Sequence, residues 1–141
     1  MDRDRLLADE ESAWIRLHAR FSAIPHERFE EPSITPDGWS AKDLMFHVGA
    51  WLAECAQILE RIREGTFDPA ESEESTDELN REWFEVSRTM EPGDVRAVFE
   101  GARQKARECF ATLPSMTPDA WTWFEESGPL HYAAHVNDLS A

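Results

Sequence analysis

The sequence predicts an all-α fold of four main helices and one shorter helix, in a single domain over residues 1–141. In several segments the hydrophobic residues recur at spacings of three and four, which is the pattern of helices that bury one face. The alternation of apolar and polar residues that marks strands is absent. The chain is 41% hydrophobic and 11% aromatic, which is typical of a domain with a packed core.

The first predicted helix covers residues 2–23, and its buried face is marked by Leu7, Trp14, Leu17 and Phe21. His18 lies one turn after Trp14, and we expect it to be structural rather than part of a site. Residues 24–39 contain three prolines and cannot continue the helix. This loop carries His26, which we expect to be solvated, and it is long enough to shape the rim of a pocket.

The second predicted helix covers residues 40–64 and has the clearest signals in the chain. Ser40 and Asp43 have the spacing of a capping box, and Gly65 is suited to the carboxyl end. The apolar residues follow spacings of 4, 3, 4, 3 and 4, namely Leu44, Val48, Trp51, Cys55, Ile58 and Ile62. His47 lies roughly 60° from Leu44, beside this apolar face rather than opposite it.

Two further helices are predicted over 76–90 and from about 94 to 113, separated by Pro92-Gly93. The apolar positions are Leu79, Trp83, Val86 and Met90 in the first, and Val95, Phe99, Ala102, Ala106, Cys109 and Leu113 in the second. The small Ala102 and Ala106 leave room for a bulky residue, for which Trp51 is a candidate. We assign no chemistry to the acidic linker at 66–75.

Residues 114–127 contain Pro114 and Pro118 and are predicted to form a loop. Its three aromatic residues, Trp121, Trp123 and Phe124, either wall a small-molecule site or simply pack on the end of the bundle. Gly128-Pro129 then opens a last helix that is predicted to run to the end of the chain.

The composition excludes several classes of function. The chain has 14 Lys and Arg against 29 Asp and Glu, a net charge of −15, which argues against binding to nucleic acid or to anionic membranes. No apolar run is long enough to span a membrane, and the charged N-terminus lacks the apolar core of a signal peptide, so we expect a cytoplasmic protein. Cys55 and Cys109 are expected to be small buried residues rather than a disulfide or a nucleophile.

Three histidines could bind a metal ion. His131 and His135 have an i, i+4 spacing that places both imidazoles on one helix face, where they can reach one ion. His47 flanks the core of another helix. Asp138 lies within the same arc as His131 and could be a further ligand or could fix the tautomer of one. Glu54, seven residues after His47, is expected to line the pocket.

The sequence also resembles a known family. The segment GWSAKDL, His47 and Trp51, followed by the HYAAH segment from His131 to His135, is similar to the DinB-like superfamily, which includes mycothiol-dependent maleylpyruvate isomerases and related thiol S-transferases. The resemblance implies an up-down-down-up four-helix bundle. It also implies that His47, His131 and His135 bind a divalent metal, often zinc or nickel, and that the protein forms a homodimer.

Two departures from the family pattern bear on this resemblance. The mycothiol-dependent isomerases tend to carry Glu at the position of His131, so the sequence resembles the DinB branch more closely. Six residues follow His135, so we expect a short final helix and a cavity that is less completely covered.

Three functions remain open from the sequence. One is a metal-dependent enzyme for thiol-linked transfer, isomerisation or hydrolysis of a small molecule, with a low-molecular-weight thiol as a candidate cosubstrate. Here the metal activates a thiol or water nucleophile, and Asp138 and Glu54 are the candidate catalytic carboxylates. The second is a non-catalytic bundle that binds a metal or a small ligand in stress or resistance. The third is a metal-free structural bundle.

Overall fold

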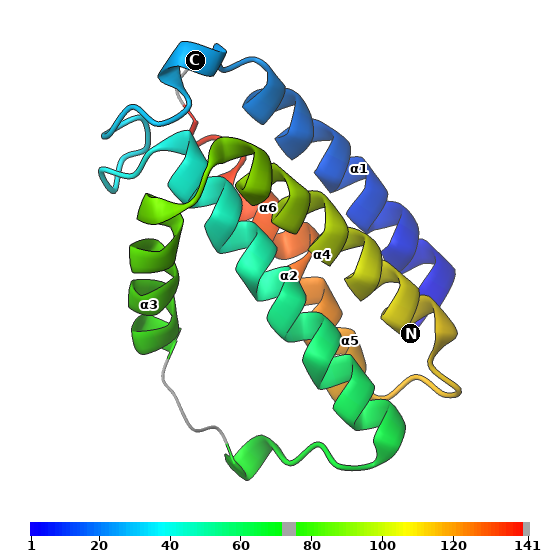
Figure 1. Cartoon of the computed structure of the whole chain (residues 1–141). Helices are drawn as coiled ribbons and strands as arrows, with labels where there is room; N and C mark the ends of the chain where they lie inside the picture. The colour runs from blue at the N-terminus through cyan, green and yellow to red at the C-terminus, as the bar shows by residue number, and fades with distance from the viewer. Residues whose placement is uncertain (72–75, 140–141) are drawn as a thin grey trace.

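The computed structural model describes residues 1–71 and 76–139. The helices are α1 (Arg3–Ser22), α2 (Ala41–Glu64), α3 (Thr76–Thr89), α4 (Pro92–Thr112), α5 (Pro118–Ser127) and α6 (Pro129–His135), with 3-10 turns at His26–Arg28 and Pro69–Glu71 (Figure 1). The described residues contain no strand, which confirms the all-α prediction. None of the helices in this part of the chain combines the length and apolar character needed to cross a membrane.

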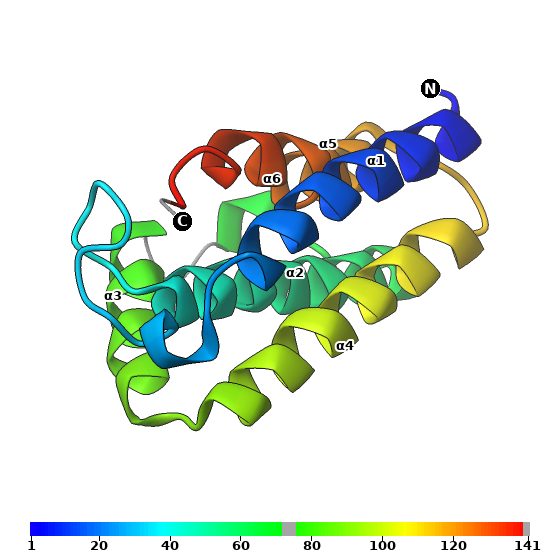
Figure 2. The ribbon, with the colours of Figure 1, turned by 90° about the horizontal axis from the view of Figure 1, so that it is seen from above.

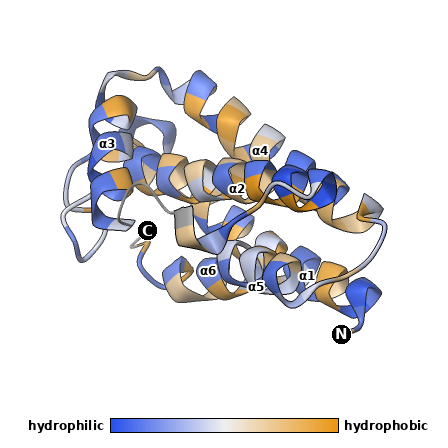
Figure 3. Ribbon diagram, turned by 90° about the horizontal axis from the view of Figure 1, so that it is seen from below, coloured by the Kyte–Doolittle hydropathy of each residue, from blue (hydrophilic) through white to orange (hydrophobic). Residues whose placement is uncertain are grey.

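The helices form two layers (Figure 2). In one layer α2 lies along α4, and in the other α1 lies along α6, which follows directly on α5. α5 also packs on α2 and so joins the layers, whereas α3 packs mainly on the flank of α2. Each helix carries bands of hydrophobic and hydrophilic residues (Figure 3), as expected for helices that bury one face. The buried hydrophobic residues form one core cluster between the layers.

The long helix α2 begins and ends as the sequence predicts. Ser40 Oγ accepts a hydrogen bond from the Asp43 amide, and Asp43 Oδ2 accepts one from the Ser40 amide, both at 3.0 Å. Gly65 ends the helix with a φ of 76°, a left-handed conformation that glycine adopts without a steric penalty. Most of the predicted apolar positions are buried, although Trp51 and Ile62 are only partly so.

The prediction of a loop over residues 114–127 is wrong for most of its length, because Pro118 starts α5 rather than preventing it. Proline is well suited to the first helical position, where no hydrogen bond requires its missing N–H. Thr117 caps the helix by accepting a hydrogen bond from the Ala120 amide at 3.2 Å. Of the aromatic residues expected in a loop, Phe124 is fully buried in the core, and the two tryptophans are partly buried and pack against the core cluster.

The last helix is shorter than predicted, because it does not run to the end of the chain. α6 ends at His135, and the chain then turns, with the Asp138 amide donating to the His135 carbonyl at 2.9 Å. Residues 140–141, the end of the predicted helix, lie outside the described residues. Leu139 is buried and returns the chain to the core.

The contact between α2 and α4 differs from the expectation that Trp51 faces Ala102 and Ala106. Trp51 instead contacts Trp83 of α3 and Trp123 of α5, with ring centroids 4.9 and 6.5 Å away. α2 and α4 approach closely at Gly49, where an added Cβ would lie 3.0 Å from Phe99 Cα. The missing side chain of Gly49 therefore allows the two backbones to approach.

Replacing Gly49 by alanine is expected to destabilise the protein, although an ordinary glycine-to-alanine change inside a helix stabilises it by about 1 kcal/mol. The added Cβ would meet backbone atoms of Phe99, which cannot move aside without shifting α4. Gly101→Ala on α4 is the matched control, since a Cβ there meets nothing within 4 Å. Urea denaturation of both variants tests this, and a stabilising Gly49→Ala would contradict the described packing.

Candidate metal centre and cavity

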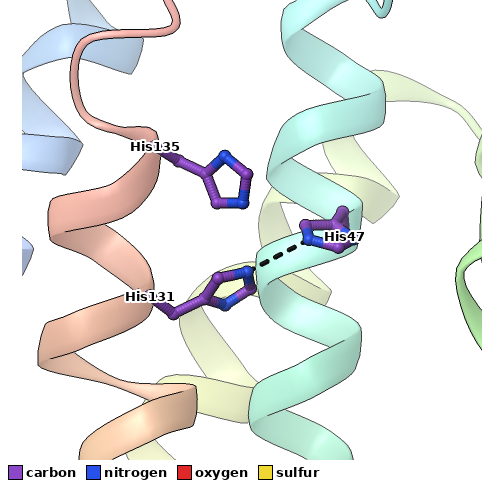
Figure 4. A group of neighbouring side chains, drawn as sticks. All are labelled: His47, His131 and His135. Atoms are coloured by element: carbon purple, nitrogen blue, oxygen red, sulfur yellow. Dashed lines mark hydrogen bonds between the residues drawn. The ribbon is translucent and has the colours of Figure 1, made fainter. Parts of the chain in front are cut away.

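Three histidines from two helices converge between the layers (Figure 4). His47 of α2 faces His131 and His135 of α6. Their potential ligand atoms all lie within 4.8 Å of one another, and the two Nε2 atoms of His47 and His131 are 3.1 Å apart. The three ring centroids are separated by 4.8 to 5.2 Å. The structure thus brings together all three residues that the sequence suggested as ligands.

The environment of His47 and His131 favours their neutral forms. Burial, and then the charge of His135, lowers the pKa of His47 to about 4. Burial, and then the charges of the other two histidines, lowers the pKa of His131 to about 3. Neutral imidazoles have a lone pair for coordination, whereas imidazolium ions have none. His47 and His131 are therefore in the protonation state that metal binding requires.

The geometry also fits a shared ion. Two nitrogens each about 2.0–2.1 Å from one zinc ion lie roughly 3 Å apart, a separation close to that of the His47 and His131 Nε2 atoms. The Nδ1 atoms of both residues are buried, and neither has a hydrogen-bond partner among the described residues. The donor set consists of three nitrogens, which suits zinc, nickel and related divalent metals.

Asp138 lies behind His135 rather than among the converging nitrogens. Its Oδ2 is 2.7 Å from His135 Nδ1, so the carboxylate accepts a hydrogen bond from the Nδ1–H tautomer. That tautomer leaves the lone pair of His135 on Nε2, toward the other two histidines. Of the two roles left open for Asp138, the structure favours orientation of His135, an arrangement common around metal ligands.

A buried ionic cluster holds α6 against α1 and α4 on the side away from His131; we call it the Glu10 cluster (Glu10, Arg103, Arg107 and Tyr132). The Tyr132 hydroxyl donates to Glu10 at 2.8 Å. Arg103 donates to both carboxylate oxygens at 2.8 and 2.9 Å, and Arg107 donates at 2.6 Å. Burial and Glu10 raise the pKa of Tyr132 well above its ordinary range, so the hydroxyl remains a donor. Because Tyr132 follows His131, this cluster sets the rotation of α6.

A cavity of about 970 Å³ opens from the histidines toward the carboxyl end of α2. His47, Trp51, Glu54, Ile58 and Arg61 line it along one face of α2. α3 contributes Leu79 and Asn80, and α5 contributes Trp123 and Glu126. Glu54 thus lines the pocket as predicted, and so does Trp123. The size is at the upper end of the range for small-molecule sites.

Several residues around the site were not expected from the sequence. Thr66, Phe67, Asp68 and Pro69 of the linker line the cavity, although no chemistry was assigned to that segment. No residue of the 24–39 loop lines it, but the Trp39 ring contacts the His47 ring, with centroids 5.1 Å apart. A polar linker carries no sequence pattern that predicts a position in a cavity wall. Trp39, in contrast, lies just before the N-cap of α2 and eight residues before His47, so its proximity to His47 was predictable.

The remaining histidines and cysteines lie apart from the site. His18 lies near Glu100 and Ser22 on the outside of α1, and His26 is exposed. Both cysteines are buried and free. Burial raises the pKa of Cys55 to about 12, and burial together with Glu60 raises that of Cys109 to about 11, so neither thiol is a reactive nucleophile.

Comparison with known families agrees with this geometry. The family model of the mycothiol maleylpyruvate isomerase N-terminal domain matches residues 11–138. The chain belongs to this family. The mycothiol maleylpyruvate isomerase N-terminal domain family is part of the DinB-like superfamily, whose members often bind metal. The matched range includes all three histidines. No curated protein and no solved structure was found to match the chain.

Proposed function

We propose that this protein binds one divalent metal ion, zinc or nickel, through His47, His131 and His135, and acts on a small molecule in the adjoining cavity. The reaction class is thiol-linked transfer or isomerisation, or hydrolysis, with a low-molecular-weight thiol as cosubstrate in the first case. One observation carries the proposal, namely that three imidazoles from two helices converge, and that two of them, His47 and His131, line a large cavity.

Two carboxylates near the site have roles in this proposal. When bound, the metal would supply a Lewis acid that lowers the pKa of a coordinated thiol or water. Asp138 holds the His135 tautomer that leaves the Nε2 lone pair free for the metal. Glu54 lies seven residues from His47, a rise of about 10 Å along the helix, so it is the weaker candidate for accepting a proton. We propose Asp138 as the first candidate for the catalytic carboxylate and Glu54 as the second.

A transferase assay tests the enzymatic reading. Protein without a histidine tag is loaded with zinc or nickel and incubated with chlorodinitrobenzene and a panel of low-molecular-weight thiols. We expect metal-dependent thioether formation, at least tenfold slower in His135→Ala because one of three ligands is lost. Activity that survives in His135→Ala, or in protein stripped of metal, would contradict the metal mechanism.

A non-catalytic bundle that binds a metal or small ligand in stress or resistance is the second candidate. The volume of the cavity, about 970 Å³, favours it, since a cavity of this size suits capture of a ligand as well as turnover. Tight binding of metal with no turnover of any thiol or ester tested would support this reading over the enzymatic one.

The order and directions of the helices fit a known type of bundle. We infer an up-down-down-up four-helix bundle over one domain at 1–141, in which α1, α2, α4 and the α5–α6 pair are the four members. The layer arrangement and the shared core cluster support this order. We also propose a homodimer, which sedimentation at several protein concentrations would test.

A further inference from the structure

Two tryptophan–glutamate pairs face the cavity from neighbouring helices. Trp51 and Glu54 are three residues apart on α2, and Trp123 and Glu126 are three residues apart on α5. All four line the cavity. Residues at this spacing are neighbours on a helix surface. The Trp51 and Trp123 rings are 6.5 Å apart with an angle of 36° between their planes, so the two pairs lie next to each other in the cavity wall.

Neither carboxylate has a protein partner. Among the described residues, no ion pair or hydrogen bond reaches Glu54 or Glu126, although many other acidic residues of the chain are paired. Glu54 is only partly exposed, so its charge loses some hydration without gaining a counter-ion. Two unpaired carboxylates beside two indole rings form a favourable environment for an organic cation, because indole faces also attract cations.

The same cavity reaches the candidate metal centre. His47 and His131 both line it, His47 has only 8% of its surface exposed, and the ligand atoms of the three histidines lie within 4.8 Å of one another. The buried polar end and the acidic, aromatic middle belong to one continuous cavity. The helix rises by about 10 Å from His47 to Glu54. A ligand that contacts both residues must therefore have two functional groups about this far apart.

We propose that the ligand of this site carries a metal-binding group at one end and a cationic group, such as an ammonium or guanidinium, about 10 Å away. The cation lies between Glu54 and Glu126, against the faces of Trp51 and Trp123. This assignment rests on the proposed function for its metal-binding end only. Arg61 and Asp68, which carry opposite charges, also line the cavity. The net charge of −15 also attracts cations to the protein.

Three matched thiols of about this length test the proposal: aminohexanethiol, mercaptohexanol and mercaptohexanoate. They are titrated into cobalt-loaded protein, and the thiolate-to-cobalt absorption band reports binding. We expect the amine to bind about tenfold more tightly than the alcohol, since one cation–π contact and a partly screened carboxylate together are worth about 1.4 kcal/mol. The acid should bind most weakly.

Paired variants assign the preference to the named carboxylates. Glu54→Gln and Glu126→Gln should each reduce the preference for the amine at least threefold. Glu125→Gln, the adjacent residue, which does not line this cavity, removes the same charge and should preserve the preference. A preference for the acid, or an amine preference that is unchanged in both Glu54→Gln and Glu126→Gln, would overturn the proposal.

A metal-free experiment separates this inference from the proposed function. Hexylamine, hexanol and hexanoate lack the thiol and do not depend on a bound metal, and calorimetry measures their binding to metal-free protein. Selective binding of hexylamine that is lost in Glu126→Gln would support the cation site even if cobalt does not bind. Equal binding of the three compounds would contradict it, even if cobalt binds with full stoichiometry.

Discussion

His47→Ala is expected to abolish tight binding of zinc or nickel, with an affinity at least about 100-fold below that of the unmodified protein. Removal of a residue that only supports a ligand already costs roughly 10–100-fold, and His47 is the single ligand that α2 supplies. Without it, the remaining pair on α6 has no third nitrogen on the facing helix. Competition with a chromophoric chelator measures both affinities.

The matched control for this change is His18→Ala, which removes a histidine that is half-exposed and far from the converging nitrogens. It should leave both the affinity and the stoichiometry unchanged. Circular dichroism of each variant shows whether the helical fold persists. If His47→Ala and His18→Ala bind metal equally well, the ion occupies another place and the proposed ligand set is wrong.

Glu10→Ala is expected to be the most destabilising single change in the α1 helix, by about 3 kcal/mol. Glu10 is fully buried and accepts hydrogen bonds from Arg103, Arg107 and Tyr132. Its removal leaves two guanidinium groups and a buried hydroxyl without their acceptor, and such unpaired groups cost more than the pair itself contributes. Thermal and urea denaturation measure the loss.

The adjacent Glu11 provides the control for this prediction. It approaches the same two arginines, at 3.5 and 3.8 Å, but about half of its side chain is exposed. Exposed pairs contribute little, so Glu11→Ala should cost less than about 1 kcal/mol. Similar losses for the two variants would mean that charge near the arginines matters and that burial of Glu10 does not.

The features that were predictable from the sequence are those with local causes. The capping box of α2 needs only Ser40 and Asp43, and both predicted hydrogen bonds form. The spacing of His131 and His135 places them on one face whatever surrounds the helix. Joining His47 to them needed the family resemblance as well, because no local rule pairs residues 84 positions apart.

Other features depend on contacts that local patterns do not encode. A proline such as Pro118 can either end a helix or occupy the first position of a new one. Here it begins α5, because Thr117 caps the helix. Trp51 faces α3 and α5 rather than α4 because Gly49 already brings α4 close to the backbone. The role of the linker residues in the cavity arises from the path of the chain in space.

Glu10 is a case in which the signal was present in the sequence and was missed. It lies three residues after Leu7 and four before Trp14, which is a position on the buried face of the first helix. A carboxylate on such a face requires a buried partner, because an unpaired buried charge is strongly unfavourable. Arg103 and Arg107, four residues apart on α4, meet that requirement.

The central claim is that one metal ion binds between His47, His131 and His135. The most direct measurement is an anomalous-difference map from crystals of the protein loaded with one equivalent of zinc. We expect a single strong peak about 2.0–2.2 Å from a nitrogen of each of the three imidazoles. A peak bound by other residues, or no peak at this position, would contradict the account.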